Sequence, residues 1–137
     1  MPVTYAKKRR EKRGRPFAFP HPHRYIFRAF RPLREMNMVK LVALYRTPPN
    51  PAEFDRHFTE VHLPLLKQFP GLRSLDVLHI TGAPIGESKY HLLVEAGFDS
   101  RDAMDKALSS KEGKAVARDL MMSGADLVTI FHGDTLA

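Results

Sequence analysis

The chain has no cysteine and no tryptophan among its 137 residues. The absence of cysteine excludes disulfide scaffolds, thiol nucleophiles, and zinc or iron–sulfur centres that are held by thiolates. No apolar run approaches the roughly 18–20 residues that cross a bilayer. No secretory signal is visible, since Arg9 and Arg10 are followed by further charge and not by an apolar stretch. We therefore expect a cytoplasmic protein without a membrane partner.

Acidic residues are scarce at the start of the chain. Residues 1–37 hold eleven Lys and Arg against only Glu11 and Glu35, a net charge of +9. Residues 38–137 hold the other eleven Lys and Arg against thirteen acids, a net charge of −2. The overall charge of +7 therefore belongs to a basic leader, and the sequence predicts a separate folded domain over residues 38–137.

The leader also holds five of the eleven prolines and six of the thirteen Phe and Tyr. Neither helical nor strand periodicity persists in it, and its prolines prevent a long helix, so we expect it to be mostly disordered. It has three interpretations: an arm that binds RNA or DNA, an organelle transit peptide, or a segment before a true start at Met36 or Met38. We favour the last of these, so nucleic acid is the least favoured partner.

The domain opens with a strand and a helix. Residues 39–46 (VKLVALYR) are rich in branched and apolar side chains, which is typical of a buried strand. Asn50 is a candidate helix N-cap, with Pro51 at the first helical position. Apolar side chains then recur at spacings of three and four, which places on one helical face Phe54, Phe58, Val61, Leu65 and Phe69.

Pro64 interrupts this helix. A proline cannot donate to the carbonyl of Glu60, and it disfavours helical angles at Leu63. We therefore expect a helix over about 51–62, followed by a kink or a second turn that ends near residue 69.

The rest of the domain predicts three strands and a broken helix. The strands are expected over residues 72–81, 90–98 and 127–132. The helix is capped by Asp99 or Ser100 and restarts at Ser109, which forms a capping box with Glu112. It ends near Gly124.

The element order βαββαβ predicts an α+β, ferredoxin-like fold, in which a four-stranded antiparallel sheet carries two helices on one face. Leu93 and apolar residues of the strands over 39–46 and 127–132 lie on the face that these helices leave open. Since that much apolar sheet should not face water, we expect a homodimer in which two sheets close into a dimeric α/β barrel.

Several segments of the domain resemble the EthD-domain family: "MVKLVALYR" before a proline-containing turn, "FDRHFTEVHLPLLKQFPGL", "YHLLVEAGFDS" and "ALSSKEG". The family's usual His-x-Pro-Leu is matched by His62, Pro64 and Leu65, and its Pro-Gly-Leu by residues 70–72. The resemblance covers about residues 38–134. It implies a dimeric α+β barrel, a small hydrophobic or aromatic compound, and an oxidoreductase-type catabolic role linked to ethyl tert-butyl ether degradation. Similar barrels include cofactor-free monooxygenases, muconolactone isomerases and polyketide cyclases.

His62 is the candidate catalytic residue. On an ideal helix it lies at about 80° from Phe54, beside the buried stripe and next to Pro64. A histidine there can act as a general acid or base near neutral pH. The alternative is a structural histidine that ties the kink to the sheet, and the resemblance makes the two interpretations comparable.

A second set of candidates lies on the strands. Tyr45, His79, His91 and Glu95 are candidates for lining the barrel cavity and binding substrate. His91 and Glu95 are four apart on the mixed face of one strand, where a carboxylate beside a histidine would have a shifted pKa. The alternative is that these residues make cross-strand or interfacial hydrogen bonds in the dimer.

No metal or cofactor site is predicted. Glu53 and His57 are four apart on the first helix, but they are interpreted as an exposed pair, since no HExxH motif exists. The glycines of residues 82–86 lead into a strand and lack the Lys-Ser/Thr of a phosphate loop.

Three functions follow as hypotheses. The first is an enzyme, a cofactor-independent oxidoreductase or an isomerase or cyclase, with His62 as its acid or base. The second is a non-catalytic protein that binds a small apolar compound for a partner oxidase. The third is a nucleic-acid-associated protein that acts through the leader.

Overall fold

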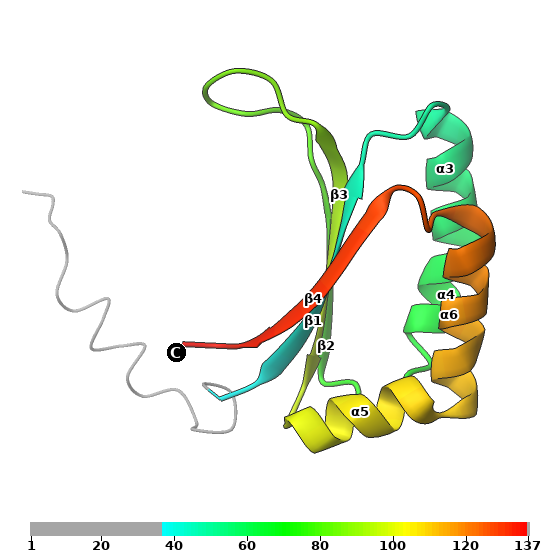
Figure 1. The fold of residues 1–137 in the computed structure, drawn as a ribbon, viewed down its shortest axis with the longest axis vertical. Coiled ribbons are helices and arrows are strands. Elements are labelled where there is room, and N and C mark those ends of the chain that lie inside the picture. The colour runs from blue at the N-terminus through cyan, green and yellow to red at the C-terminus, as the bar shows by residue number, and fades with distance from the viewer. Residues whose placement is uncertain (1–36, 137) are drawn as a thin grey trace, which may run out of the picture. The chain divides into compact units, whose positions relative to one another are not determined.

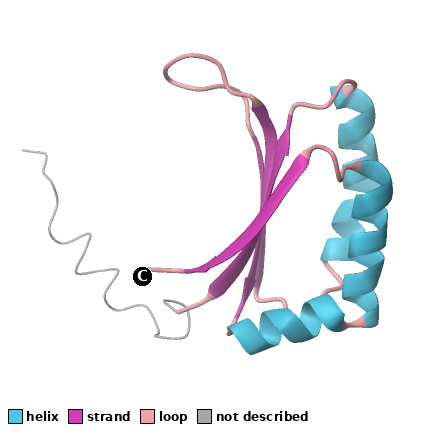
Figure 2. Ribbon diagram, viewed as in Figure 1, coloured by secondary structure: helices cyan, strands magenta, loops and turns pink. Residues whose placement is uncertain are grey.

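A computed structural model of the chain describes residues 37–136, and the predictions for residues 1–36 lie outside this part. Its sheet is antiparallel with the order β2-β3-β1-β4 (Figures 1 and 2). The strands are β1 (Val39–Arg46), β2 (Ser74–His79), β3 (Tyr90–Phe98) and β4 (Val128–Asp134). The predicted ferredoxin-like α+β fold is confirmed, with β1 and β3 over the residues expected and β2 shorter at both ends.

The helices form a single layer on one side of the sheet (Figure 1). They are α3 (Pro51–His57), the π-helix η2 (Phe58–His62), α4 (Leu63–Leu66), α5 (Arg101–Ser109) and α6 (Lys111–Ser123). Asn50 caps α3 as predicted, since its side chain accepts a hydrogen bond from the Glu53 amide. The restart is capped by Ser110 and not by Ser109. No helix within residues 37–136 is long and apolar enough to cross a membrane.

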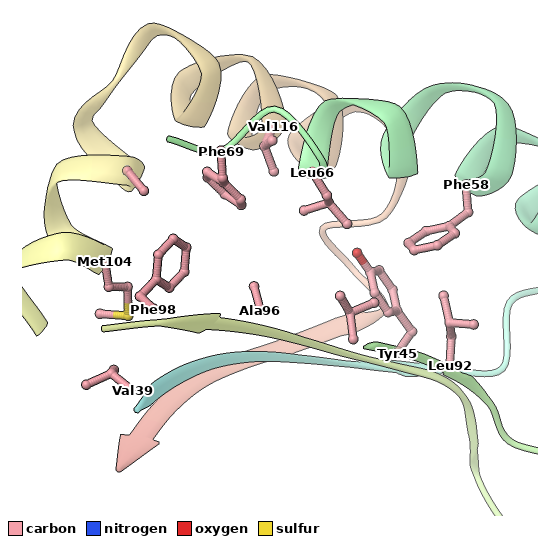
Figure 3. Close-up of a cluster of buried hydrophobic side chains, with 12 residues drawn as sticks. Val39, Tyr45, Phe58, Leu66, Phe69, Leu92, Ala96, Phe98, Met104 and Val116 are labelled. Atoms are coloured by element: carbon pink, nitrogen blue, oxygen red, sulfur yellow. The ribbon is translucent and has the colours of Figure 1, made fainter. Parts of the chain in front are cut away.

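The core lies between the sheet and this helical layer (Figure 3). Every second residue of β3, from Leu92 to Phe98, is buried there, as the apolar alternation predicts. Phe69 packs its ring edge-on against Phe98 at 5.9 Å. Met104 of α5 and Val116 of α6 complete this end of the core, which fixes both helices against the sheet.

The prediction for Pro64 is wrong in one respect, because the helix runs through it. Leu63 keeps helical angles (φ −60°, ψ −44°), and its amide donates to the carbonyl of Phe58, five residues back. This wider π turn lies directly before the proline, at the point where the regular pattern of four-residue hydrogen bonds would lose its donor. The result is a continuous helical segment from α3 to α4.

The face of the sheet away from the helices is uncovered within residues 37–136 and carries apolar side chains. Cross-strand partners share a face, so the register places on it Val42, Leu44, Leu78, Leu93 and Phe131, which we call the open-face patch. Leu78 and Phe131 are 56% and 48% exposed. Leu93 therefore lies where the sequence predicts.

Gly113 lets the start of α6 lie close against the end of α5, and substitution by alanine should destabilise the fold. A Cβ at this buried position would overlap the carbonyl oxygen of Ala107 and lie 2.7 Å from that of Leu108. We expect Gly113→Ala to lower the free energy of unfolding by about 1–3 kcal/mol in urea denaturation, although alanine is the better helix former. Gly82→Ala, where a Cβ meets nothing within 4 Å, is the matched control. Equal stability of the two variants would contradict the packing.

Candidate functional site

Three polar side chains from two packed helical segments meet on the helix-covered side of the sheet. Asp119 of α6 lies between His57, at the end of α3, and His62, at the end of η2. His57 Nε2 is 3.0 Å and 3.1 Å from the two carboxylate oxygens, and His62 Nδ1 is 2.8 Å from Oδ2. The side chains of His62 and Asp119 are only 6% and 14% exposed. A nearly buried carboxylate is thus shared by two imidazoles.

The π turn explains why both histidines reach one carboxylate. On an α-helix, residues five apart lie about 140° apart around the axis. A π turn closes its hydrogen bond five residues back, so residues five apart come close to the same side. His57 and His62 are separated by this turn, which aligns both rings with Asp119.

The hydrogen bonds also fix which nitrogen of His62 is basic. An ionised carboxylate only accepts, so Nδ1 of His62 carries the hydrogen and donates it to Asp119. Nε2 is then the nitrogen with a free lone pair. Phe58 packs at 5.6 Å from the His62 ring and limits its rotation. The arrangement is a histidine oriented by a carboxylate, which suits proton abstraction.

Tyr45 of β1 adds a buried hydroxyl to the same place. Its side chain is packed edge-on against Phe54 and Phe58, and Figure 3 shows its oxygen pointing toward the helices. This hydroxyl makes no hydrogen bond to any residue within 37–136. Burial, and to a lesser extent the charge of Asp119, raises the pKa of Tyr45 to about 12. Tyr45 therefore stays a neutral hydrogen-bond donor across the physiological range.

Two neighbouring spaces lie beside these groups and share part of their lining. The inner cavity has room for about 10 Å³, close to one water molecule, and is lined by Tyr45, Phe54, His57, Phe58, His62, Leu120, Ser123 and Gly124. The outer groove measures about 400 Å³ and is bordered by Pro48, Pro49, Asn50, Glu53, Phe54, His57, Ser123 and Leu127. Phe54, His57 and Ser123 line both spaces, so they form the boundary between groove and cavity.

The predicted cavity residues do not form one cluster. Tyr45 joins His62 on the helix-covered face, whereas Glu95 lies on the uncovered face, where it accepts from Lys40 Nζ at 3.0 Å. His79 is exposed on β2, and its ring lies against that of His91 at 4.8 Å.

The expectation that His91 and Glu95 share a strand face is wrong. The register shifts between Tyr45 and Arg46, which pair with Leu92 and Tyr90, so His91 is an extra residue in a β-bulge. The bulge turns the His91 side chain toward α3, where Nε2 lies 2.6 Å from Asp55 Oδ1.

Asp119 and His57 were not identified as site residues from the sequence. Glu53 accepts from the Asn50 side chain and not from His57, which bonds to Asp119 instead. A signal for Asp119 does exist: it follows Val116 by three residues and precedes Leu120, which places a carboxylate on the apolar stripe of α6.

The raised pKa of Tyr45 predicts a late ionisation in an ultraviolet titration. Tyrosinate absorbance of the wild type should include one component near pH 12, and Tyr45→Phe should lack it. Because the pKa of Tyr45 is raised from 10.0 in the folded state, the contribution of its neutral hydroxyl to the free energy of unfolding is complete below pH 10. This contribution is lost as pH rises toward 12. Asp119→Asn should move the component to lower pH, though still above 10, since burial is the larger cause. Loss of the component in the control Tyr90→Phe would refute the assignment.

Known proteins share both the fold and parts of the sequence. The family model for the EthD domain matches residues 46–122. An ethyl tert-butyl ether D (EthD) family protein from Bacillus halodurans C-125 is 41% identical, with a TM-score of 0.69, and the match covers 70% of this chain and 96% of that protein. An uncharacterised 11.0 kDa protein from the thcB–thcC intergenic region of Rhodococcus erythropolis is 26% identical over 97 residues, which is 71% of this chain and 94% of that protein.

A more distant structure shares the fold alone. SnoaB, a cofactor-independent oxygenase from Streptomyces nogalater, is 22% identical with a TM-score of 0.51, over 74% of this chain and 93% of its own. The match of the family model, together with the similarity to the Bacillus halodurans protein, confirms the resemblance that the His-x-Pro-Leu segment indicates. The chain belongs to the EthD-domain family.

Proposed function

We propose that the protein removes a proton from a small, largely apolar carbonyl compound, with His62 as general base. The observation that carries this proposal is the His62–Asp119 pair beside the hydroxyl of Tyr45, which bonds to no residue within 37–136. A base and a neutral donor that line the same cavity are the two groups needed to form and hold an enolate.

The proton transfer follows from the hydrogen bonds. His62 Nε2 takes a proton from the carbon next to the substrate carbonyl, and its ring becomes a cation. Asp119, held through Nδ1, stabilises that cation, and His57 donates to the same carboxylate and keeps it in place. The electron pair of the broken C–H bond forms a carbon–carbon double bond, and the π pair of the carbonyl moves to its oxygen, which accepts a hydrogen bond from Tyr45. The proton returns to carbon or leaves through water in a later step.

The sizes of the two spaces support a particular class of substrate. The inner cavity holds one water-sized group, which fits a carbonyl oxygen. The outer groove has the volume of a small-molecule site, with Pro48, Phe54 and Leu127 on its walls. We infer a compound whose polar end replaces water in the cavity and whose apolar body lies in the groove. The described oxygenase SnoaB works without a cofactor on a related fold, which agrees with chemistry led by side chains.

Deuterium exchange tests this function without a known physiological substrate. In D₂O, the purified protein should catalyse saturable exchange at the carbon next to the carbonyl of 2-tetralone, measured by proton NMR. His62→Asn keeps a donor for Asp119 but lacks Nε2, and it should slow exchange by about 10²-fold or more. His132→Asn, which changes an exposed histidine of β4, is the matched control.

An unchanged exchange rate in His62→Asn would remove His62 from the reaction. Saturable binding of 2-tetralone without exchange would instead favour the binding protein that serves a partner oxidase.

We also propose that the open-face patch pairs with the same patch of a second copy. Leu44, Leu78 and Leu93 are cross-strand neighbours at its centre, and the helices within residues 37–136 cover only the opposite face. A contiguous apolar surface of this kind is typical of an interface. A ferredoxin-like protein from Jannaschia sp. CCS1, 15% identical with a TM-score of 0.54 over 70% of this chain and 97% of its own, is described as dimeric.

Sedimentation velocity at micromolar concentration tests the dimer. The wild type should sediment as a dimer, and Leu93→Asp should sediment as a folded monomer, because a carboxylate at the centre of the interface would be buried without a partner. Met122→Asp, at an 87% exposed position of α6, is the control and should stay dimeric. A monomeric wild type would contradict the proposal.

A further inference from the structure

A second cluster of chemically active side chains lies apart from the His62 site. Asp55 of α3, His79 of β2 and His91 of β3 each offer one ligand atom, and all three atoms lie within 4.8 Å of one another. The elements that supply them are far apart in the sequence and meet where the β-bulge turns His91 toward α3. From this juxtaposition we propose a binding site for a divalent first-row transition metal.

The spacing requires only small movements to become a coordination shell. Two ligands at about 2.1 Å from a tetrahedral zinc ion lie about 3.4 Å apart. To bind the ion, His91 Nε2 and Asp55 Oδ1 move from 2.6 Å to about 3.4 Å apart. The other distances between ligand atoms, which are at most 4.8 Å, shorten to about the same value. His79 is exposed, whereas His91 is 7% exposed and packs edge-on against Phe54 at 5.7 Å. One imidazole of the site is therefore open to solvent and the other is anchored in the core.

The other hydrogen bonds of these residues leave the ligand atoms available. Within residues 37–136, Asp55 and His91 bond through their side chains only to each other, and His79 makes no hydrogen bond through its ring. The carboxylate accepts, so His91 Nε2 carries a hydrogen in the metal-free protein. A metal that binds at Nε2 takes the place of that hydrogen, and the ring proton moves to Nδ1, so the imidazole stays neutral.

The donor set decides the class of metal. Two imidazoles and one carboxylate suit Zn²⁺ and its neighbours, whereas Ca²⁺ and Mg²⁺ prefer oxygen ligands. Three protein ligands leave at least one coordination position for water or an anion. The side chain of Asp55 is 43% exposed, so the metal can reach its ligands from solvent on this side. The bound metal would join α3 to β2 and β3.

Isothermal titration of the metal-free full chain with Zn²⁺ tests the site. The wild type should bind about one equivalent of Zn²⁺ with a saturable isotherm. His79→Ala, which alters an exposed ligand and leaves the core intact, should weaken binding by about tenfold or more, and Asp55→Asn should do the same. Zn²⁺ should raise the melting temperature of the wild type and not of His79→Ala.

Other histidines provide the controls. His132→Ala removes an exposed strand histidine elsewhere, and a double variant of His21 and His23 removes the His-Pro-His of the leader. Both should bind Zn²⁺ as the wild type does. The proposal is overturned if the wild type shows no saturable binding, or if His79→Ala binds as tightly as the wild type. Loss of binding in the His21 and His23 variant alone would also overturn it, by moving the metal to the leader.

Discussion

The carboxylate of Asp119 is the constraint on which the helical layer depends. A carboxylate taken out of water is costly unless hydrogen bonds replace its hydration. Here the only donors to it within the described residues are the two imidazoles of the neighbouring helical segment. The need to satisfy this charge therefore holds α6 against α3 and η2. It also contributes to the raised pKa of Tyr45, so one group links helix packing to the chemistry of the cavity.

Local sequence patterns predict the elements that obey a regular period. The alternation from Leu92 to Phe98 specifies a strand with one buried face, and Asn50 and Ser100 mark helix starts because their side chains satisfy free amides. The π turn and the β-bulge escaped prediction. Each is a deviation of one residue, and each is accompanied by hydrogen bonds to distant residues, His62 to Asp119 and His91 to Asp55. A window of neighbouring residues contains neither partner.

The sequence predicts those site residues that stand out locally, and not the contacts that join residues far apart in the chain. His62 stands out through its place beside Pro64, and Tyr45 through its place on a buried strand. Their relation to Asp119 depends on how α6 packs, which is set by contacts such as those of Gly113. The residues of the sheet were harder to assign, since the face to which His91 belongs depends on the bulge. Phe54, whose ring contacts both Tyr45 and His91, lies between the two clusters.

The π turn has a consequence for how this site can change during evolution. A π turn contains one more residue than the α-helical turn that it replaces, so a helix can accommodate one inserted residue in this way. Removing one residue between His57 and His62 would leave the two histidines four positions apart on a regular α-helix, about 40° apart around the axis. Both rings would still face Asp119, so a member of the family could lose this residue and keep both the pair and the fold.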